Sequence, residues 1–357
     1  MPNVGKSTLF NALTSADISA ENYPFCTIEP HVGIVEVPDP KLYKIAALIK
    51  PEKITPTTVT FIDIAGLVKG ASKGEGLGNK FLSNIRQVDA ILHVVRCFKD
   101  KEITHVEGRI DPEDDALIIE TELLLSDIET IEKRLLKTEK QLKSNQSKAR
   151  KEYELLERLF EHFNNGFPAK TFPFLDTEKR LIKPLNLLTL KPILYIANLE
   201  ESSISDIPNN NLAPGLNKLA KKNNEEVIFL CAKIEQEISS LKTDEKELFL
   251  KEYNLTEPGL FKLINKTYKI LGLNNFYTCG PKEVRSWTIS KNSSAQEAAG
   301  TIHTDFQRGF IKAEIYRSSD LIRLGSEKAV KEAGLIKLEG KNYLVKNGDC
   351  IYFRFNL

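Results

Sequence analysis

The sequence lacks the features that mark disulfide-rich, zinc-bound or membrane-spanning proteins. It has 5 cysteines, an odd number, and no C-x-x-C spacing, so neither a zinc site nor a redox pair is indicated. No apolar run approaches the roughly 20 residues of a membrane helix, and the N-terminus has no basic segment followed by an apolar one. We therefore expect a soluble cytoplasmic protein with reduced thiols and no membrane contact.

A large excess of charge of one sign is also absent. Lys+Arg 50 against Asp+Glu 49 gives a net charge of +1, so no overall field draws the protein onto DNA or an anionic membrane. We expect no DNA partner, and any RNA contact requires a local basic patch. Scattered surface charges are the simpler interpretation of the basic residues near the C-terminus, which are Lys282, Arg285, Lys312 and Arg317.

The 357 residues are enough for two or three domains. Five short β-branched runs bounded by turn residues alternate with helix-compatible segments, which predicts an α/β fold with a mostly parallel sheet. These runs are Val32–Val37, Thr57–Ile64, Ala90–Cys97, Pro192–Asn198 and Glu226–Cys231. We assign residues 1–275 to this domain.

A long segment rich in Glu, Lys and Leu lies between the third and fourth runs. Its apolar residues keep a spacing of three and four, pause at Ser144–Ser147 and then resume, which predicts a coiled-coil helical hairpin inserted at about 113–165. These apolar residues are Leu124, Ile128, Ile131, Leu135, Leu142, Tyr153, Leu156, Phe160 and Phe163.

Residues 276–357 predict a separate small α+β domain. A helical segment, Ser294–Phe306, is surrounded by strand-like pieces. An Asn347–Gly348 pair lies between the last two pieces and predicts a β-hairpin there. The strand-like pieces are Val284–Ile289, Phe310–Tyr316, Tyr343–Val345 and Cys350–Phe355.

The first residues contain the second half of a phosphate-binding loop. Gly5 lets backbone N–H groups face phosphates, Lys6 reaches the β- and γ-oxygens, and Ser7 is a Mg²⁺ ligand. By itself this piece is also compatible with a plain helix start. The full pattern has an earlier glycine and a preceding strand, so we expect the first strand to be missing, and a misplaced start codon is our preferred explanation. The loop residues are Asn3, Val4, Gly5, Lys6, Ser7 and Thr8.

A second site supports the nucleotide-binding interpretation. The apolar strand ending at Asp63 is followed by Gly66, the Asp-x-x-Gly arrangement in which the carboxylate meets the Mg²⁺ shell and the glycine senses the γ-phosphate. Asp63 as a simple turn residue is the alternative. Between the two motifs, Thr27 is a candidate switch threonine that completes the Mg²⁺ shell, or else an ordinary loop residue.

Base recognition is expected at the end of the run Pro192–Asn198. Guanine-specific proteins have Asn-Lys-x-Asp there, whereas this chain has Leu199 in place of the lysine and Glu201 in place of the aspartate. The longer carboxylate arm disturbs the bidentate geometry that favours guanine, while Asn198 can bond the adenine edge; a helix cap is the alternative. Cys231 and Ala232, followed by a lysine, resemble the Ser-Ala-Lys element that closes such base pockets.

Together these motifs closely resemble the YchF subfamily of Obg-related GTPases, the Obg-like ATPases. The resemblance covers essentially the whole chain, and its most specific motif is the continuous segment 63–78. It implies an Obg-type P-loop domain, a coiled-coil insertion, a C-terminal β-grasp (TGS) domain, Mg²⁺, a preference for ATP over GTP, and binding to the ribosome. We expect the large subunit as the partner and a monomeric protein.

The resemblance also implies two further roles. Leu67 stands where many GTPases have a water-positioning glutamine, and the family's mobile-loop histidine corresponds to His105; a lone loop histidine is otherwise a solvated side chain. Asn3 corresponds to the asparagine that holds K⁺ in potassium-activated relatives. His93 lies in an apolar strand and is interpreted as a core residue.

The sequence therefore favours a ribosome-associated, Mg²⁺-dependent ATPase with Lys6 and His105 in catalytic roles. Two alternatives stay open. One is a GTPase of the same fold. The other is a ribosome- or RNA-binding module with negligible hydrolysis because its phosphate loop is truncated.

Overall fold

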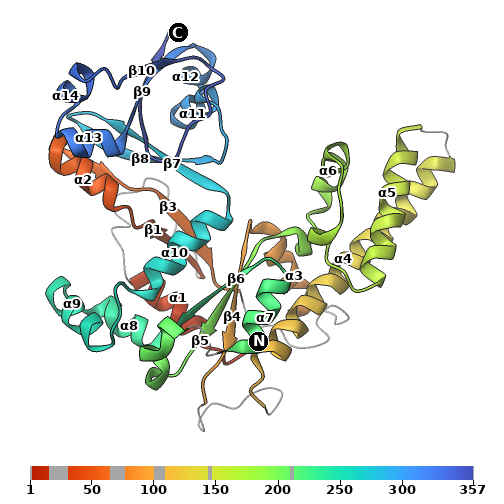
Figure 1. Ribbon diagram of the computed structural model, residues 1–357. Coiled ribbons are helices and arrows are strands. Elements are labelled where there is room, and N and C mark those ends of the chain that lie inside the picture. Colours follow the sequence, from red (N-terminus) through yellow and green to blue (C-terminus); the bar gives the residue numbers. More distant parts are fainter. Residues whose placement is uncertain are drawn as a thin grey trace. The chain divides into compact units, whose positions relative to one another are not determined.

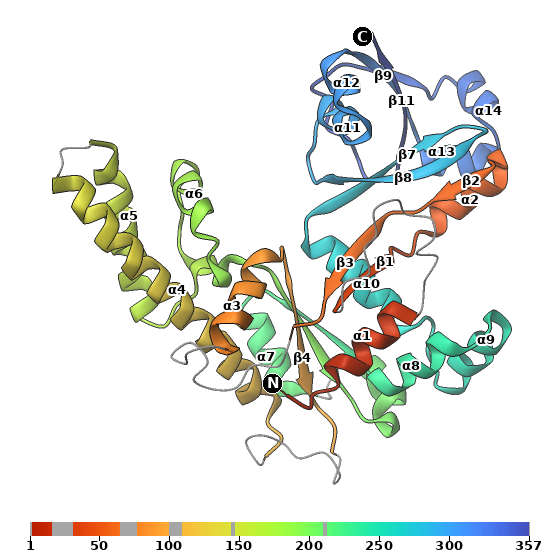
Figure 2. The same ribbon diagram turned by 180° about the vertical axis from the view of Figure 1, so that it is seen from behind.

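The computed structural model describes residues 2–15, 31–64, 77–99, 109–143, 147–209 and 213–356. They form two compact units, drawn in Figures 1 and 2. Unit 1 holds the N-terminal helix, His31 and the chain from Ile62 to Gly259, and unit 2 holds Val32–Phe61 and the chain from Leu260 onward. Each unit has its own buried apolar clusters.

The helices and strands of unit 1 follow the α/β alternation of the sequence. They are α1 (Lys6–Ser15), α3 (Leu77–Gln87), β4 (Ile91–Arg96), α4 (Pro112–Lys143), α5 (Ser147–Asn164), η2 (Ala169–Thr171), α6 (Asp176–Ile182), η3 (Lys183–Leu185), η4 (Leu188–Leu190), β5 (Ile193–Asn198), η5 (Glu201–Asn209), α7 (Pro214–Lys222), β6 (Glu226–Leu230), α8 (Ala232–Ser240) and α9 (Thr243–Glu252), where η marks a 3₁₀ helix.

The sheet of unit 1 is parallel, as predicted. Its strand order is β4-β5-β6, and the register pairs Arg96 with Asn198 and Asn198 with Leu230. All residues of the central strand β5 are buried, because a parallel strand between two neighbours with helices on both faces needs an apolar sequence. The carboxyl ends of the strands thus meet at one edge, where Asn198 ends β5.

The helical hairpin predicted at about 113–165 is confirmed. Helices α4 and α5 lie side by side (Figure 1) and bury Ile131, Leu155, Leu159 and Phe163 between them and the segment that follows α5. Midway along α4 the buried Asp127 accepts hydrogen bonds from the backbone N–H groups of Leu188 and Thr189, each at 2.8 Å. A carboxylate that carries such bonds fixes the chain that returns from the hairpin to β5.

Unit 2 combines two sheets. Its elements are β1 (Val32–Glu36), α2 (Pro40–Ile49), β2 (Lys53–Thr55), β3 (Thr58–Ile62), α10 (Gly259–Ile270), β7 (Leu273–Cys279), β8 (Glu283–Ser290), α11 (Ala295–Ile302), α12 (Thr304–Arg308), β9 (Phe310–Arg317), α13 (Ser318–Leu324), α14 (Glu327–Glu332), β10 (Lys337–Glu339) and β11 (Asp349–Phe355). The larger sheet has the order β10-β9-β11-β7-β8-β2, and among the described strands β1 and β3 form a separate two-stranded sheet.

Strands β1 and β3 form an antiparallel ribbon. The bond from Asp63 N–H to the His31 carbonyl and the bond from Val37 N–H to the Thr57 carbonyl, both 2.8 Å, pair early residues of one strand with late residues of the other. Within the described ranges β3 and β4 therefore belong to different sheets. The predicted parallel arrangement holds for β4, β5 and β6 and does not extend to β1 and β3.

The predicted hairpin at Asn347–Gly348 is wrong. Residues 343–345 form no strand, and Leu344 makes only an isolated bridge with Ser294. The turn residues instead hold the start of β7: the Asn347 side chain accepts from Asn275 N–H at 2.9 Å, and Gly348 N–H, with φ of 87°, donates to the Asn275 carbonyl at 2.8 Å. Turn chemistry is thus used for a long-range contact rather than a local hairpin.

The division of the units differs from a boundary at residue 275. Helix α2 packs against α13 and the strands β7 and β8, and β2 extends the C-terminal sheet by pairing with β8. The segment 32–61 is therefore grouped with the C-terminal region, although it lies early in the sequence. Among the described residues no helix combines the length and the apolar character needed to cross a membrane.

Candidate functional site

The phosphate loop has the backbone conformation that its glycine predicts. Asn3 and Gly5 have φ of 57° and 87°, and α1 begins at Lys6 with Leu9 N–H donating to the Gly5 carbonyl at 3.0 Å. Successive left-handed and helical residues turn N–H groups toward one concave surface, which is the arrangement that binds anions. The first turn of α1 adds the positive end of a helix dipole.

Asn198 fixes this loop to the sheet edge. Its Nδ2 donates to the Val4 carbonyl at 2.9 Å, and its Oδ1 accepts from Ala232 N–H at 2.9 Å. Asn198 is buried, with 4% of its surface exposed. A Cβ on Gly5 would lie 2.2 Å from Asn198 Nδ2, so the loop touches Asn198 so closely that only glycine fits. The Asn198 side chain therefore holds the loop, and its contact with adenine stays a prediction.

Lys6 and Asp63 converge in front of the loop. The Lys6 ammonium forms an ion pair with Asp63 Oδ1, and Lys6 remains 30% exposed while the Asp63 side chain is 9% exposed. His31 Nδ1 lies 3.9 Å from Asp63 Oδ2, and the His31 side chain is 71% exposed. Sequence reasoning did not single out His31; its position directly before β1, opposite the end of β3, could have drawn attention to it.

The residues predicted to recognise the base lie just after the ends of β5 and β6. Leu199 is buried and its N–H donates to the Leu230 carbonyl at 2.8 Å. Glu201 Oε1 accepts from Tyr253 O–H at 2.9 Å, and Glu201 Oε2 lies 3.5 Å from Lys233 Nζ. Glu201 therefore has a tyrosine and a lysine partner. Tyr253, which follows α9, was not among the predicted residues.

Three predicted site residues, Thr27, Gly66 and His105, lie outside the described residues. Ser7 is exposed at the start of α1. Cys231 and Ala232 are buried at the end of β6, where Ala232 meets Asn198. No cluster of three metal-binding side chains occurs in the part of the chain that the structure describes. Mg²⁺ at phosphates needs only one or two protein oxygens, and the Ser7 hydroxyl and the Asp63 carboxylate are donors of that kind.

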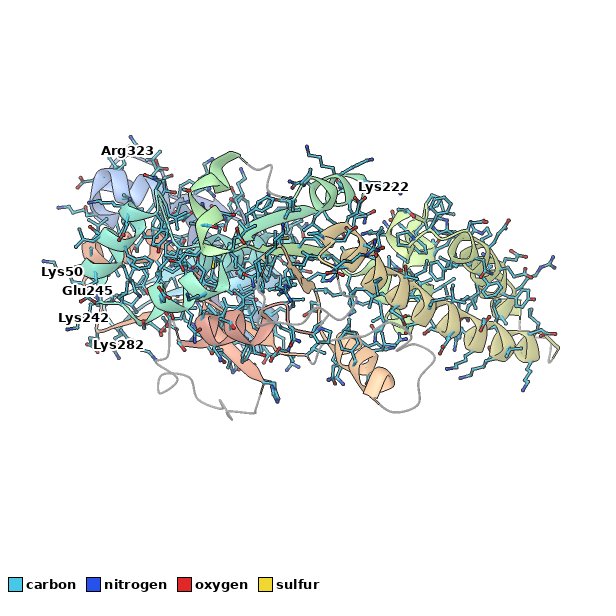
Figure 3. All side chains as sticks on the ribbon, turned by 90° about the horizontal axis from the view of Figure 1, so that it is seen from below. Lys50, Lys222, Lys242, Glu245, Lys282 and Arg323 are labelled. Atoms are coloured by element: carbon cyan, nitrogen blue, oxygen red, sulfur yellow. The ribbon has the colours of Figure 1, made fainter. Side chains whose placement is uncertain are left out.

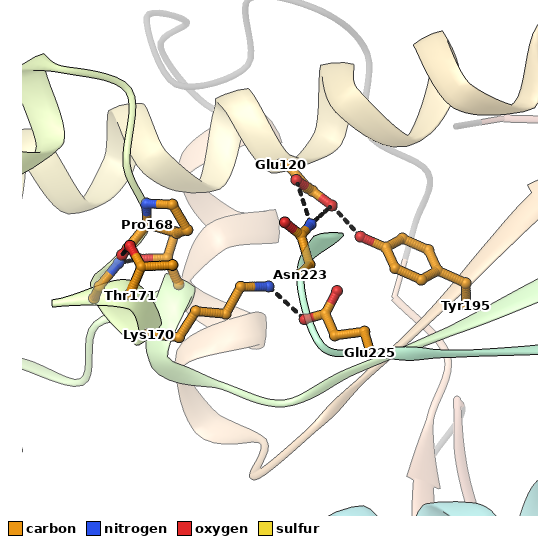
Figure 4. Close-up of polar contacts among 9 residues, drawn as sticks. Glu120, Pro168, Lys170, Thr171, Tyr195, Asn223 and Glu225 are labelled. Carbon is orange, nitrogen blue, oxygen red and sulfur yellow. Dashed lines mark hydrogen bonds and ion pairs between the residues drawn. The ribbon is translucent and has the colours of Figure 1, made fainter. Parts of the chain in front are cut away.

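A partly buried polar network joins the hairpin to the sheet (Figure 4). Tyr195 of β5 donates to Glu120 of α4, Asn223 Nδ2 donates to Glu120 Oε1 at 3.1 Å, and Lys170 of η2 pairs with Glu225. Burial raises the pKa of the Glu225 carboxyl. Because β5 ends at Asn198, this network connects the base of the hairpin to the strand that holds the phosphate loop.

His93 is a core residue, as the sequence indicated. It is 7% exposed and its ring centroid lies 5.6 Å from that of Tyr195. Burial lowers the pKa of His93 to about 3, so the ring is neutral at physiological pH.

Two of the four basic residues near the C-terminus, Arg285 and Arg317, have partners within unit 2. Arg317 pairs with the buried Asp349 and donates to the Asn347 carbonyl at 3.0 Å, and the Arg285 guanidinium stacks 3.9 Å above the Trp287 ring. Lys282 is exposed at the surface (Figure 3). Since Arg317 serves an internal ion pair, it is a poor candidate for phosphate contact, which weakens the idea of an RNA-binding patch.

Comparison with known families covers both ends of the chain. Residues 1–148 match a family described as "50S ribosome-binding GTPase", and residues 273–356 match the C-terminal family of YchF GTPases, described as "Protein of unknown function".

Several curated proteins similar to this chain are named ribosome-binding ATPase YchF. The protein of Bacillus subtilis (strain 168) is 52% identical over 357 residues, that of Haemophilus influenzae 48% and that of Escherichia coli O157:H7 46%, each match covering 100% of this chain and 98% of the relative. The solved structure of the Schizosaccharomyces pombe YchF GTPase superposes with a TM-score of 0.88 at 37% identity, over 99% of this chain and 96% of that one.

Proposed function

Because the chain belongs to the YchF family of Obg-related P-loop nucleoside-triphosphate hydrolases, we propose that it hydrolyses ATP in preference to GTP and associates with the ribosome. The names of the bacterial relatives support both parts. The observation that carries the hydrolase assignment is the ion pair between Lys6 and Asp63 beside a loop that Asn198 holds in place.

The loop binds the phosphates and Lys6 neutralises the charge that develops on the transferring group. The Lys6 ammonium exchanges its bond to Asp63 for the β- and γ-oxygens, which its 30% exposure permits. Asn198 contributes by keeping the backbone N–H groups of the loop fixed before the nucleotide arrives, so no reorganisation is required at the moment of reaction. Ser7, Asp63 and Thr27 would hold Mg²⁺, which screens the phosphate charges when bound.

The preference for ATP rests on Leu199 and Glu201. Leu199 is buried and lacks the long ammonium side chain that the lysine of guanine-specific proteins packs along the base. The Glu201 carboxylate already accepts from Tyr253 and lies beside Lys233. Both features remove hydrogen-bonding partners that guanine requires. A site without these partners loses its selectivity for guanine by orders of magnitude. Asn198 contributes by hydrogen bonding to Val4 of the loop and to Ala232 after the end of β6.

Several finer assignments belong to the same proposal. His105 orients the attacking water, Gly66 senses the γ-phosphate, and Asn3 supplies an oxygen to K⁺. Residues 1–275 form the nucleotide domain and residues 276–357 a TGS domain. The protein is a cytoplasmic monomer that contacts the large ribosomal subunit. Equal turnover in K⁺ and Na⁺ would remove the role of Asn3, and an unchanged rate after His105→Ala would remove that of His105.

Calorimetric titration with non-hydrolysable ATP and GTP analogues tests the proposal. We expect the ATP analogue to bind at least about tenfold more tightly in the presence of Mg²⁺. Lys6→Ala should lower turnover by about 100-fold or more, whereas Lys222→Ala, which removes an exposed lysine from the last turn of α7 (Figure 3), should leave it unchanged.

Tighter binding of the GTP analogue would contradict the ATP assignment and support the GTPase alternative. Co-sedimentation with ribosomes is scored separately, with wild type and Lys6→Ala in parallel. If both sediment with ribosomes while neither hydrolyses nucleotide, the chain is a binding module and the hydrolase assignment fails.

A further inference from the structure

Tyr253 lies directly after α9, and packing fixes its ring. The ring centroid is 5.0 Å from that of Phe249, and the backbone N–H of Tyr253 donates to the Phe249 carbonyl at 3.3 Å. Figures 1 and 2 both show α9 beside α8. A ring packed in this way presents its hydroxyl at a fixed position. Tyr253 packs against an apolar cluster from η5, the end of β6 and α8, whose buried members are Ile204, Cys231, Ile234 and Ile238.

The Tyr253 hydroxyl holds the Glu201 carboxylate. Its O–H donates to Glu201 Oε1 at 2.9 Å, and Lys233 Nζ lies 3.5 Å from Glu201 Oε2. The hydrogen bond to Glu201, together with burial and the charges of nearby glutamates, raises the pKa of Tyr253 to about 12. The hydroxyl therefore keeps its proton at physiological pH and remains a donor. Each oxygen of the Glu201 carboxylate thus faces a donor of this protein.

The sequence position of Glu201 connects this contact to base recognition. Glu201 stands where guanine-specific proteins have the aspartate of Asn-Lys-x-Asp. An ionised carboxylate can only accept hydrogen bonds. Guanine offers two donors on the recognised edge, N1–H and the 2-amino group, whereas adenine has an unprotonated N1 and no 2-amino group. A carboxylate that is free to turn to the base therefore favours guanine, and one that is engaged elsewhere loses this preference.

We propose that Tyr253 is a specificity-determining residue, which engages the Glu201 carboxylate and thereby lowers the affinity of the site for GTP relative to ATP. Tyr253 acts through Glu201, so it is a positioning residue and needs no contact with the base. The inference rests on the proposed function, since it takes the base to lie at Glu201. Lys233 contributes less, because its side chain is 71% exposed and an exposed ion pair at 3.5 Å holds a carboxylate only weakly.

Removal of the hydroxyl tests the role of Tyr253. Tyr253→Phe keeps the packed ring and frees one Glu201 oxygen for guanine. Calorimetric titrations of the full chain with non-hydrolysable ATP and GTP analogues and Mg²⁺ should show that the ratio of the GTP to the ATP dissociation constant falls about tenfold, the size expected for one hydrogen bond to a charged group. The kcat for ATP should change less than about twofold, because Lys6 and Asp63 are untouched. A merely structural role would weaken both nucleotides equally, and an unchanged ratio would overturn the proposal.

A second variant breaks the same contact from the other side. Glu201→Asp shortens the side chain by one methylene, which takes the carboxylate out of reach of Tyr253 and leaves the apolar cluster intact. The ratio should fall about tenfold, and Tyr253→Phe should lower it little further in this background. A further tenfold fall in the double variant would show that Tyr253 acts without Glu201, which contradicts the positioning role.

Tyr316→Phe is the matched control in unit 2. The Tyr316 hydroxyl also donates to a glutamate, Glu327, and its ring also belongs to an apolar cluster. The substitution removes the same type of hydrogen bond from a residue outside the predicted base site, so the ratio should equal that of the wild type. A tenfold fall in Tyr316→Phe would mean that the loss of any such bond changes the ratio, and the assignment to Tyr253 would fail.

The wild-type protein tests the proposed function separately. If it binds the GTP analogue more tightly and Tyr253→Phe still lowers the ratio about tenfold, the ATP assignment fails and the role of Tyr253 stands. If the wild type prefers the ATP analogue and Tyr253→Phe leaves the ratio unchanged, the ATP assignment stands and the role of Tyr253 is lost. If the wild type binds neither analogue, both fail.

Discussion

Two aspartates at the ends of structural elements, the half-buried Asp63 in unit 1 and the buried Asp39 in unit 2, have opposite surroundings. Asp39 caps α2 by accepting from Lys41 N–H at 3.1 Å, and it accepts from Tyr277 O–H at 2.8 Å and from Ser286 O–H at 3.5 Å. Among the described residues, the side-chain partners of Asp63 are groups that reach solvent, the Lys6 ammonium and the more distant His31.

The difference separates a structural carboxylate from a chemical one. Every donor around Asp39 belongs to an ordered element, so its lone pairs are already used and a ligand has nothing to gain. Asp63 can give up Lys6 to a phosphate and turn its oxygens to a metal, because the lysine is 30% exposed and can move. Burial alone therefore does not identify function; the mobility of the partners does.

Replacing each aspartate by alanine is the strongest way to break this comparison. Asp63→Ala should lower ATP turnover by about 100–1000-fold and change the free energy of unfolding by less than about 1 kcal/mol, since its ion pair is partly exposed. Asp39→Ala should lower the free energy of unfolding by about 2–4 kcal/mol, because it removes a helix cap and leaves the buried Tyr277 hydroxyl without its acceptor. Steady-state kinetics and urea denaturation measure the two effects.

The comparison fails if the effects are exchanged. A large loss of stability in Asp63→Ala with turnover intact would make that ion pair a structural one. A turnover loss in Asp39→Ala that persists well below its unfolding transition would give unit 2 a part in catalysis that its saturated hydrogen bonds do not indicate.

Two glycines with left-handed backbone sharpen the contrast within unit 1. Gly5 has φ of +87° and no room for a Cβ, which would lie 2.2 Å from Asn198 Nδ2, whereas Gly166 has φ of +80° and nothing within 4 Å. Gly5→Ala should weaken ATP binding by about 30–100-fold, since it adds a clash to the backbone strain of roughly 1–2 kcal/mol. Gly166→Ala shares only the strain and should leave ATP affinity unchanged in calorimetry.

The double variant identifies the clash as the cause. In an Asn198→Ala background the close neighbour is absent, so Gly5→Ala should add only a small further loss of affinity. Full additivity of the two substitutions would show that the loop does not depend on the Asn198 contact.

The sequence predicted the sheet strands well because a buried parallel strand leaves a continuous apolar run. The observed bounds of β5 and β6 differ from the predicted ones by one residue at an end. Strand β2 was missed, since Lys53–Thr55 is short and mostly exposed and becomes a strand only by pairing with β8. Its partner lies more than 200 positions away, beyond any local pattern.

The residue types of the site were predicted from the sequence, but several of the contacts between their side chains were not. The types of residue at Lys6, Asp63 and Asn198 follow from the chemistry of phosphates and metals, and the fold brings them to one edge. The task of Asn198 was not foreseen, because its bond to Val4 spans 194 positions. The same holds for Tyr253 and Glu201, 52 positions apart. Contacts between side chains so far apart in the sequence are determined by tertiary packing, which produces no periodic pattern in the sequence.

The smallest expected effect concerns His93, in the interior of the unit 1 sheet. Burial lowers its pKa from 6.5 to about 3, so the unfolded chain binds a proton below pH 6.5 that the folded chain does not. Its contribution to stability is complete above pH 6.5 and is lost as the pH falls toward 3. Between pH 7.5 and pH 5.5 this amounts to about 1.4 kcal/mol.

His93→Gln isolates this contribution, because glutamine stays neutral across the range. In urea denaturation followed by circular dichroism, wild type should lose about 1.4 kcal/mol more than His93→Gln on going from pH 7.5 to pH 5.5. The sole tryptophan, Trp287, lies in unit 2, so its fluorescence reports that unit. If fluorescence shows the same His93-dependent loss as circular dichroism, the two units unfold together; if it shows none, acid weakens the nucleotide-binding unit alone. An equal pH dependence of both proteins by both probes would mean that His93 is solvated in the folded chain.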